Sequence, residues 1–344
     1  MYSFINDYSE GAAQEIIDEL VRTNFEQTVG YGNDDYCAEA RELISRKLDC
    51  PSAHVHFLVG GTQTNLTIIA AALRPHQGVV SAVSGHINIH EAGAIEATGH
   101  KVLPIPSTDG KIYAQGIDKL FESHFSDGSF DHIVQPGMVY ISNPTEIGTI
   151  YSKRELTDIS AVCKKWNVPL FMDGARLGCA LTADKNDLTL SDITKLCDAY
   201  YIGGTKMGAL FGEAVVLNNE ELNKDFRYLM KQKGGLFAKG RLLGIQFKTL
   251  FSNDLYFRLA RHANDMAKKL SDAFQDLGYS MLVESMSNQI FPILPKTVIA
   301  KLGEKFKIGF WESFDENSDV VRFCTSWATD EKAVDELIAT LKSL

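Results

Sequence analysis

Apolar and polar positions along this chain change their period repeatedly, which separates short strand-like runs from longer helical segments. Seven runs have the length and apolar content of buried strands: 55–59, 79–83, 102–105, 138–142, 170–172, 199–202 and 214–217. The segments between them mainly carry apolar residues at helical spacing. This alternation predicts an α/β fold, with a mostly parallel seven-stranded sheet flanked by helices.

The two ends of the chain follow other patterns. A first helix is predicted to begin after Ser9 as its N-cap, with one apolar stripe made by Ile16, Ile17, Leu20 and Val21. From about residue 240 the pattern predicts a long helix that ends near Gly278, then short strands and a final helix. We therefore expect a large domain over residues 1–240 and a smaller α+β domain over residues 241–344.

The composition is that of an ordinary globular protein. Of 344 residues, 45% are hydrophobic and 23% charged, and the net charge is −10. This acidic balance argues against unspecific binding of nucleic acids or anionic membranes, which requires a basic face. No apolar run is long enough to span a membrane and the first residues lack a signal-peptide pattern, so we expect a cytoplasmic protein. The six cysteines form no Cys-x-x-Cys pair and are expected to be free thiols.

Lys206 is the first candidate for chemistry. The apolar run 199–202 leads into Gly203, Gly204 and Thr205, with this single lysine at its mouth. Partial burial of an ammonium lowers its pKa and frees the amine to attack a carbonyl, so Lys206 can hold an aldehyde cofactor. A solvated loop lysine gives the same pattern, and the prediction therefore depends on the neighbours of Lys206.

Asp173 is such a neighbour, because it ends the apolar run 170–172 one strand–helix–strand unit before Lys206. In a parallel sheet both side chains emerge at the carboxyl edge, where such folds bind ligands. Upstream, a glycine turn containing Gly61 and Thr62 joins another strand to a helix. Its backbone N–H groups can bind a small phosphate, with an ordinary tight turn as the alternative.

Four further polar residues follow or interrupt apolar runs: His86, Asn143, Glu146 and Arg322. His86 can stack on a planar ring and exchange protons near neutral pH. Asn143 can donate to a cofactor oxygen and Glu146 can act as an acid or base, although Asn-Pro is also a common turn. Arg322 suits a carboxylate, with a structural ion pair as the alternative. No histidine spacing indicates a metal site.

In this order, the elements resemble the threonine aldolase and β-eliminating lyase family of pyridoxal-phosphate enzymes. The similarity is carried by Asn6-Asp7-Tyr8-Ser9, Gly61-Thr62-Gln63, the segment around His86, Asp173-Gly174-Ala175-Arg176, Thr205-Lys206 and Val321-Arg322. It implies an aspartate-aminotransferase-like fold, pyridoxal 5'-phosphate as cofactor, and cleavage of L-threonine, L-allo-threonine or related β-hydroxy-α-amino acids to glycine and an aldehyde. It also implies a homodimer or homotetramer, with segment 1–30 at the active-site entrance.

The resemblance further implies roles for single residues. Lys206 matches the lysine that binds the cofactor aldehyde, and Asp173 matches the carboxylate that pairs with the ring nitrogen. The implied cofactor-binding set is Gly61, Thr62, His86, Asn143, Asp173, Thr205, Lys206 and Lys239. Lys239 would reach the cofactor phosphate of a neighbouring subunit, with a solvated lysine cluster as the alternative. The implied substrate-binding set is Asn6, Tyr36, Arg176 and Arg322, and the catalytic set is Lys206, His86 and Asp173.

One loop departs from many bacterial members of the family, which carry Glu-Asn-Thr-His after the fourth strand. This chain reads Ser142-Asn143-Pro144-Thr145-Glu146, and looks more like the branch of phenylserine-type and some protozoan aldolases. His86 is therefore the first candidate for the base that acts on the substrate hydroxyl, with Glu146 or a water as alternatives. β-Elimination, transamination or racemisation by the same residues, or a protein that kept the fold without the chemistry, are alternative functions.

Overall fold

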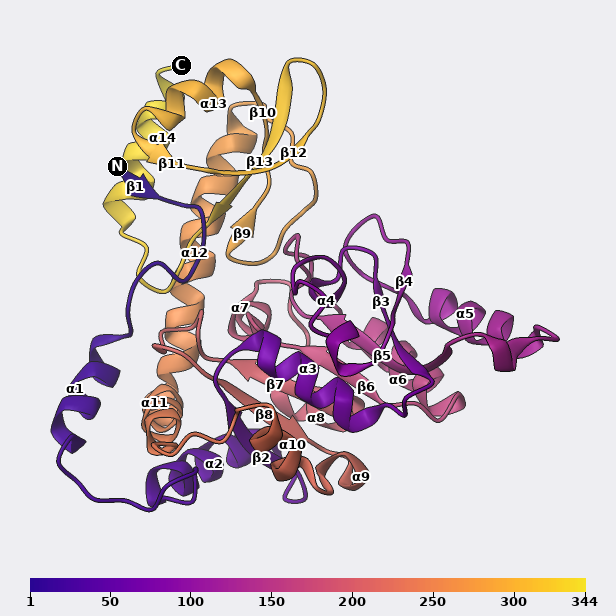
Figure 1. The fold of residues 1–344 in the computed structure, drawn as a ribbon. Helices are drawn as coiled ribbons and strands as arrows, with labels where there is room; N and C mark the ends of the chain where they lie inside the picture. The colour runs from indigo at the N-terminus through magenta and orange to yellow at the C-terminus, as the bar shows by residue number, and fades with distance from the viewer.

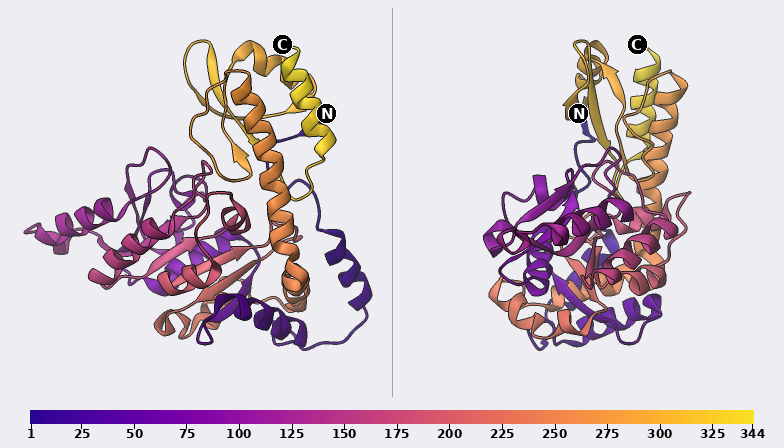
Figure 2. Two further views of the ribbon diagram at one scale, coloured as in Figure 1. Left: turned by 180° about the vertical axis from the view of Figure 1, so that it is seen from behind. Right: turned by 90° about the vertical axis from the view of Figure 1, so that its right-hand side faces the viewer.

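The computed structural model describes residues 1–344, which form two packed parts joined by one long helix (Figures 1 and 2). The larger part centres on a seven-stranded sheet with strand order β2-β8-β7-β6-β5-β3-β4. Its strands are β2 (His54–Leu58), β3 (Gln77–Ala82), β4 (Val102–Ile105), β5 (Gln135–Ser142), β6 (Leu170–Asp173), β7 (Ala199–Gly203) and β8 (Glu213–Leu217). All seven predicted strands are confirmed, with small differences at their ends.

Only β8 runs against the other strands of this sheet. It pairs antiparallel with β2 and β7, whereas the remaining pairs are parallel. The carboxyl ends of β2 to β7 and the start of β8 therefore meet at one edge of the sheet. The prediction of a mostly parallel sheet is confirmed.

Helices cover both faces of the sheet. One face carries α2 (Asp35–Leu48), α5 (Ala114–Ser126), α6 (Lys153–Lys165), α7 (Leu177–Thr182), α8 (Leu190–Leu196) and α11 (Arg241–Phe251), and the other carries α3 (Gly61–Ala72), α9 (Glu220–Asn223) and α10 (Phe226–Gln232). Strand side chains alternate between the two cores: Tyr200 and Ile202 face the first, Ala199 and Tyr201 the second. Burial on both faces explains why the strands are continuous apolar runs in the sequence.

The smaller part combines short strands with helices near the chain's end. Its elements are β9 (Gln289–Ile290), β10 (Ile293–Pro295), α13 (Lys296–Gly303), β11 (Phe306–Lys307), β12 (Gly309–Ser313), β13 (Ser318–Cys324) and α14 (Glu331–Lys342). The long helix α12 (Leu255–Asp276) belongs to both parts, since Ala260 packs in the larger core and Leu270 in the smaller one. The predicted long and final helices are confirmed. Because α11 packs on α2 and α12 spans both parts, the domain boundary at residue 240 stays a prediction.

None of the helices combines the length and the apolar character needed to cross a membrane. All six cysteines are free.

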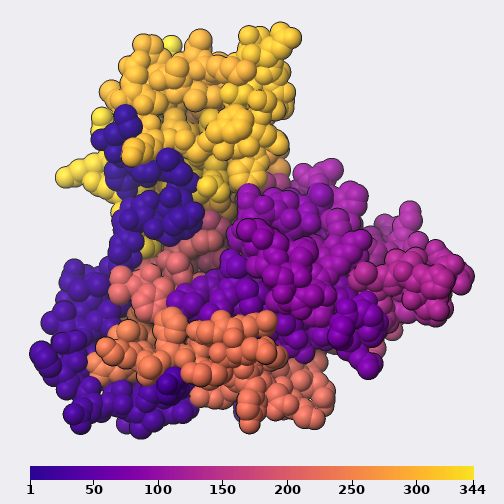
Figure 3. Space-filling view, in the orientation of Figure 1, coloured from indigo at the N-terminus to yellow at the C-terminus, as the bar shows by residue number.

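The N-terminal segment contacts both parts of the molecule. Strand β1 (Tyr2–Ser3) pairs in parallel with β11, and the backbone N–H of Cys324 donates to the carbonyl of Phe4 at 2.8 Å. The segment then runs as a strip along one side of the molecule towards helix α1 (Gln14–Thr23) (Figure 3). Residues at the chain's start are thereby fixed next to residues near its end.

The predicted start of helix α1 is wrong. The helix begins at Gln14, and Ser9 instead lies in a turn where its hydroxyl donates to Oδ1 of Asn6 at 3.0 Å. Ser and Asn side chains favour such local turns as readily as they favour helix caps, and the sequence does not separate the two. The apolar stripe is also narrower than predicted, because Ile16 is buried while Val21 is 71% exposed.

Candidate active site

A cavity of about 230 Å³ opens at the carboxyl edge of the larger sheet, where β5, β6 and β7 end. The candidate residues that line it are Gly61, Thr62, His86, Glu146, Asp173, Arg176, Thr205 and Lys206. The fold thus brings together residues from distant parts of the sequence, at the edge where a parallel sheet of this class offers a binding site.

Lys206 follows β7 at the cavity wall, where the buried acid Glu213 also lies. Burial and the charge of Arg176 lower the pKa of Lys206. Glu213, at the start of β8, is 3% exposed and lines the same cavity. Its carboxylate accepts from the Thr205 hydroxyl at 2.9 Å and from the Gly204 N–H at 3.1 Å. Burial raises the pKa of Glu213 to about 8, so this carboxyl group is a weaker acid than an exposed glutamate.

Asp173 ends β6 with its carboxylate buried under the cavity. Its Oδ2 accepts from the Tyr140 hydroxyl at 2.6 Å and the Asn65 amide at 3.1 Å. Its Oδ1 accepts from the Tyr201 hydroxyl at 2.5 Å and from a backbone N–H two residues on at 3.0 Å. Burial alone would raise the pKa of Asp173, but the charge of His86 and these donors together lower it. The carboxylate therefore stays charged and can pair with a protonated ring nitrogen.

The start of helix α3 faces the cavity with its first backbone N–H groups, which have no partner inside the helix. Gly61 begins this helix close to Tyr201, since a Cβ on this residue would lie 3.1 Å from the Tyr201 hydroxyl. The turn is held by Gln63, whose side chain accepts from the N–H of Val59 at 3.2 Å. A helix start of this kind, with the Thr62 side chain beside it, suits an anion such as phosphate.

His86 begins the short helix α4 (His86–Ile89) and is fixed by two carboxylates. Its Nδ1 contacts Oε1 of Glu91 at 2.8 Å, and its backbone N–H donates to Oε1 of Glu146 at 2.9 Å. Burial alone would lower the pKa of His86, but the hydrogen bond to Glu91 and the charges of Asp173 and Glu91 raise it. Burial also raises the pKa of Glu146, whose Oε1 accepts from the Ser142 hydroxyl at 2.7 Å.

Arg176 reaches the cavity from the loop between β6 and α7. Its Nε and Nη2 donate to the two carboxylate oxygens of Asp7 at 2.6 and 3.0 Å. Asp7 is fully buried and also accepts from the amide of Asn288 at 2.8 Å. The guanidinium is thus oriented by the N-terminal segment and by the smaller part at once.

Four of the predicted residues lie outside the cavity, and three of them contact other groups. Oδ1 of Asn6 accepts from the backbone N–H of Tyr8 and from Ser9. The Tyr36 hydroxyl donates to Glu26 at 2.5 Å, and Lys239 is exposed. Arg322, on β13, donates to the carbonyl of Ile5 at 3.0 Å and lies over the ring of Trp311.

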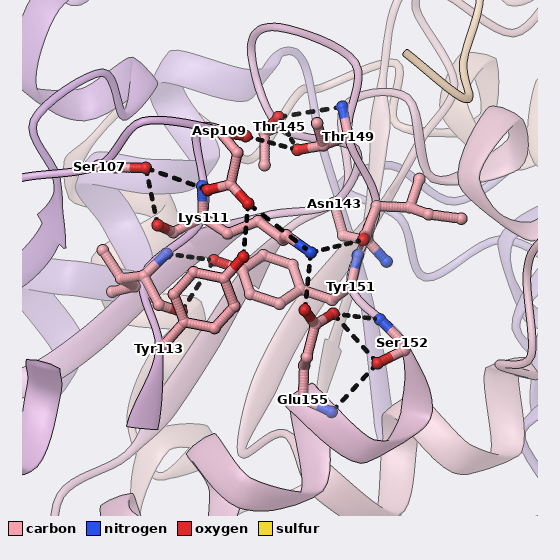
Figure 4. Close-up of polar contacts among 12 residues, drawn as sticks. Ser107, Asp109, Lys111, Tyr113, Asn143, Thr145, Thr149, Tyr151, Ser152 and Glu155 are labelled. Atoms are coloured by element: carbon pink, nitrogen blue, oxygen red, sulfur yellow. Dashed lines mark hydrogen bonds and ion pairs between the residues drawn. The ribbon is translucent and has the colours of Figure 1, made fainter. Parts of the chain in front are cut away.

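Asn143 is the fifth predicted residue outside the cavity lining. Its side chain supports the loop that carries Glu146. Its Oδ1 accepts from the backbone N–H of Tyr151 at 3.2 Å. Across the same loop, the Thr149 hydroxyl donates to the carbonyl of Asp109 at 2.7 Å, as part of a network of polar contacts (Figure 4). The residue therefore shapes the loop in this structure.

Sequence reasoning missed several polar residues of the site: Asp7, Asn65, Glu91, Tyr140, Tyr201 and Glu213. Two signals could have found some of them. Asp7 stands inside a motif that was recognised, and Glu91 follows His86 by little more than one helical turn. The tyrosines were interpreted only as apolar strand residues, because a phenol fits a buried strand as well as a hydrogen-bonded site.

A comparison with protein families matches residues 4–295 to the model described as beta-eliminating lyase. The chain belongs to this family. Within it, the low specificity L-threonine aldolase of a Pseudomonas species is 31% identical over 99% of this chain and 97% of that protein. A solved structure of threonine aldolase from Leishmania major is 48% identical, with a TM-score of 0.97 over 100% of this chain and 99% of that one. The family predicted from the sequence motifs is confirmed.

A more distant structure confirms the fold of this family member. Aspartate aminotransferase from Thermus thermophilus is 12% identical and has a TM-score of 0.70, covering 100% of this chain and 92% of that one. At this identity the likeness concerns the fold alone. The expected aspartate-aminotransferase-like architecture is therefore correct.

Proposed function

We propose that this β-eliminating lyase family member is a pyridoxal-phosphate-dependent aldehyde-lyase that cleaves L-threonine, L-allo-threonine or a related β-hydroxy-α-amino acid to glycine and an aldehyde. The observation that carries the proposal is the meeting of Lys206, Asp173 and the start of α3 in one cavity. The names of the Pseudomonas and Leishmania relatives, which match almost the whole chain, support it.

The residues of the cavity fit pyridoxal phosphate. The start of α3 suits the phosphate, and the charged Asp173 suits the ring nitrogen. His86 would lie against the ring, and Lys206, whose pKa burial lowers, would hold the aldehyde. When bound, this cofactor accepts the electron pair of a bond to the substrate Cα.

Arg176 binds the substrate carboxylate in this proposal. Asp7 occupies Nε and Nη2 of its guanidinium, which leaves Nη1 for the substrate. Holding the carboxylate there would fix the orientation of the substrate, and with it the choice of the bond at Cα that breaks. The substrate roles of Asn6, Tyr36 and Arg322 stay predictions.

His86 takes the proton of the substrate's β-hydroxyl through Nε2. As the O–H bond breaks, the oxygen forms a carbonyl to Cβ, the Cα–Cβ bond breaks and the aldehyde leaves. A proton returned to Cα completes glycine. Glu146, which is buried against His86 and lines the same cavity, is the alternative base.

The chain works as a homo-oligomer in this proposal. The segment after α1 carries Phe25, which is 95% exposed, and Val29, which is 66% exposed. Apolar surface of this kind favours coverage by a second copy. Lys239 and Tyr36 lie outside the cavity of their own subunit. The roles that the family resemblance gives to these two residues and to Asn143 stay predictions. Light scattering on the purified protein tests the assembly, and a monomer with full activity would contradict it.

The visible spectrum and the products of the purified protein test the proposed function. L-threonine, L-allo-threonine and L-phenylserine are each added to protein loaded with pyridoxal phosphate, and glycine and aldehyde are measured. We expect a visible cofactor band that changes with substrate, and equal amounts of glycine and aldehyde. A band without aldehyde contradicts the aldol cleavage, and the absence of any band contradicts the cofactor.

The family description favours β-elimination as the second candidate function. The same lysine, aspartate and phosphate site would serve it, with the substrate held so that a different bond breaks. Elimination from serine releases a keto acid and ammonium in place of glycine and an aldehyde. Measuring both product pairs in one assay therefore separates the two reactions.

A further inference from the structure

Four polar side chains, those of His86, Glu91, Asn65 and Asp173, are linked by consecutive hydrogen bonds at the cavity. Nδ1 of His86 contacts Oε1 of Glu91 at 2.8 Å, and the same oxygen accepts from the amide of Asn65 at 2.7 Å. That amide also donates to Oδ2 of Asp173 at 3.1 Å. His86, above the site proposed for the cofactor ring, is thereby connected to the carboxylate proposed to pair with the ring nitrogen.

Glu91, the hydrogen-bond acceptor next to His86, decides which ring nitrogen of His86 carries the proton. A carboxylate only accepts hydrogen bonds, so the contact with Glu91 requires the proton on Nδ1 of His86. In the neutral ring Nε2 is then an unprotonated acceptor. The side chain of Glu91 is 0% exposed, so water does not compete for this hydrogen bond.

Asn65 fixes Glu91 from the other side. Its amide nitrogen lies between two carboxylates, Glu91 and Asp173, and the opposite orientation would turn the amide oxygen towards both of them. Because Asn65 lies in the second turn of α3, the helix that supplies the proposed phosphate site also holds the partner of His86. One rigid element therefore aligns both.

We propose that Glu91 is a positioning residue for the reaction: it holds His86 with Nδ1 protonated, so that Nε2 is free to take the proton of the substrate hydroxyl. Asn65 fixes Glu91 in this role. The inference rests on the proposed function, because it gives His86 the task of a base. Glu91 itself touches neither substrate nor cofactor.

A purely structural role does not account for the charge of Glu91. Its second oxygen, Oε2, is buried without any hydrogen-bond partner. Burying a bare carboxylate oxygen costs free energy, and a glutamine would keep the acceptor atom without the charge. Glu91→Gln is therefore expected to keep the melting temperature while it weakens the reaction.

The charge of Glu91 also sets the direction of a pH effect. His86 is faced by Glu91, by Asp173 from β6, by Glu146 from the loop after β5, by His90 at the end of α4 and by Lys206 after β7. Of these, the bond to Glu91 raises the pKa of His86 most. Without it, the acid-side fall of kcat/KM moves to lower pH, since the base stays neutral further down.

The first experiment measures the tautomer of His86 directly in the holoenzyme. The protein is labelled with ¹⁵N-histidine, and the signals of His86 among the nine histidines are assigned by their loss in His86→Phe. Above the pKa of His86 we expect a protonated Nδ1 and an unprotonated Nε2. A proton on Nε2 overturns the proposal. This result needs no turnover, so it is independent of the product assay that tests the proposed function.

The second experiment compares the pH profiles of Glu91→Gln, Glu91→Asp and the parent. We expect Glu91→Gln to retain the visible band of the cofactor, to lose on the order of 100-fold in kcat at neutral pH, and to show the acid-side fall at lower pH. Glu91→Asp keeps the charge and is expected to restore the acid-side position in part. The control is Glu96→Gln, an exposed carboxylate in the next turn, which should match the parent.

Unchanged kcat and an unchanged acid-side fall in Glu91→Gln overturn the proposal. So does a uniform loss in both Glu91 variants that follows a lower melting temperature, because that is the result of a structural role. Loss of activity at an unchanged melting temperature, together with the shifted profile, supports the positioning role.

Discussion

Asp7 and Arg176 stand far apart in the sequence, yet they form a two-point ion pair in which Nε and Nη2 of the arginine donate to both oxygens of the aspartate, at 2.6 and 3.0 Å. Asn288 of the smaller part donates to the same carboxylate at 2.8 Å. This one acid therefore joins the N-terminal segment, the larger part and the smaller part at the wall of the cavity. Four predictions concern buried acids of this kind, and a fifth concerns Lys206.

Replacing Asp7 by Asn is expected to lower stability and to weaken substrate binding. Breaking a buried ion pair from one side costs about 3–5 kcal/mol, because it leaves the guanidinium without its partner. Since Arg176 then loses its fixed orientation, KM for the amino acid is expected to rise more than kcat falls. Urea unfolding and steady-state kinetics measure the two effects. The control is Glu15→Gln, an exposed acid of α1.

The same ion pair gives a pH dependence at the acid end. The charges of Arg176 and Lys206 overcome burial and lower the pKa of Asp7 from 3.8 to about 2. The stabilising contribution of this group is complete above pH 3.8 and is lost as pH falls towards 2. The difference in unfolding free energy between the parent and Asp7→Asn is therefore expected to shrink over that range. A constant difference would contradict the assignment.

Replacing Tyr201 by Phe tests the donors around Asp173. The change removes the hydroxyl that donates to Oδ1 at 2.5 Å, and a hydrogen bond to a charged group contributes about 1.5–3 kcal/mol. We expect a lower melting temperature and weaker retention of pyridoxal phosphate, because the pKa of Asp173 rises. Tyr228→Phe, which alters a phenol that is 77% exposed, is the control. Equal behaviour of the two variants would show that the hydroxyl is not needed.

Glu213→Gln tests a pH dependence of stability that is opposite to that of Asp7, because the contribution of Glu213 is lost as pH rises. Burial raises the pKa of Glu213 from 4.5 to about 8. A raised pKa contributes stability that is present below pH 4.5 and is lost as pH rises towards 8. The glutamine stays neutral, so its melting temperature is expected to fall less than that of the parent between these pH values. Parallel curves, like those expected for the exposed control Glu312→Gln, would contradict this prediction.

The sheet could be predicted from sequence because each buried strand corresponds to one continuous apolar run. The sites of Lys206, Asp173 and Gly61 follow from the same logic, since the carboxyl ends of parallel strands meet at one edge. Local patterns and the direction of the strands are enough to place these residues at one edge. Knowledge of which side chains touch is not required.

The partners of buried polar groups could not be predicted in this way. The substrate role of Arg322 stays a prediction, and its contacts in the structure were not foreseen. It lies over Trp311 and donates to the carbonyl of Ile5, contacts that depend on how β12, β13 and the N-terminal segment pack. Glu213 was placed just outside a strand because its charge interrupted the apolar run. Its burial is possible only because Thr205 and a backbone N–H donate to it.

In the proposed function Lys206 holds the cofactor and makes the chemistry possible. This role is tested by comparing the parent with Lys206→Ala, both incubated with pyridoxal phosphate, in visible absorbance and in aldehyde release from L-threonine and L-phenylserine. We predict that the variant folds with the same melting temperature before cofactor is added, but lacks the parent's visible band and releases almost no aldehyde. A variant that keeps both the band and the aldehyde would contradict the account.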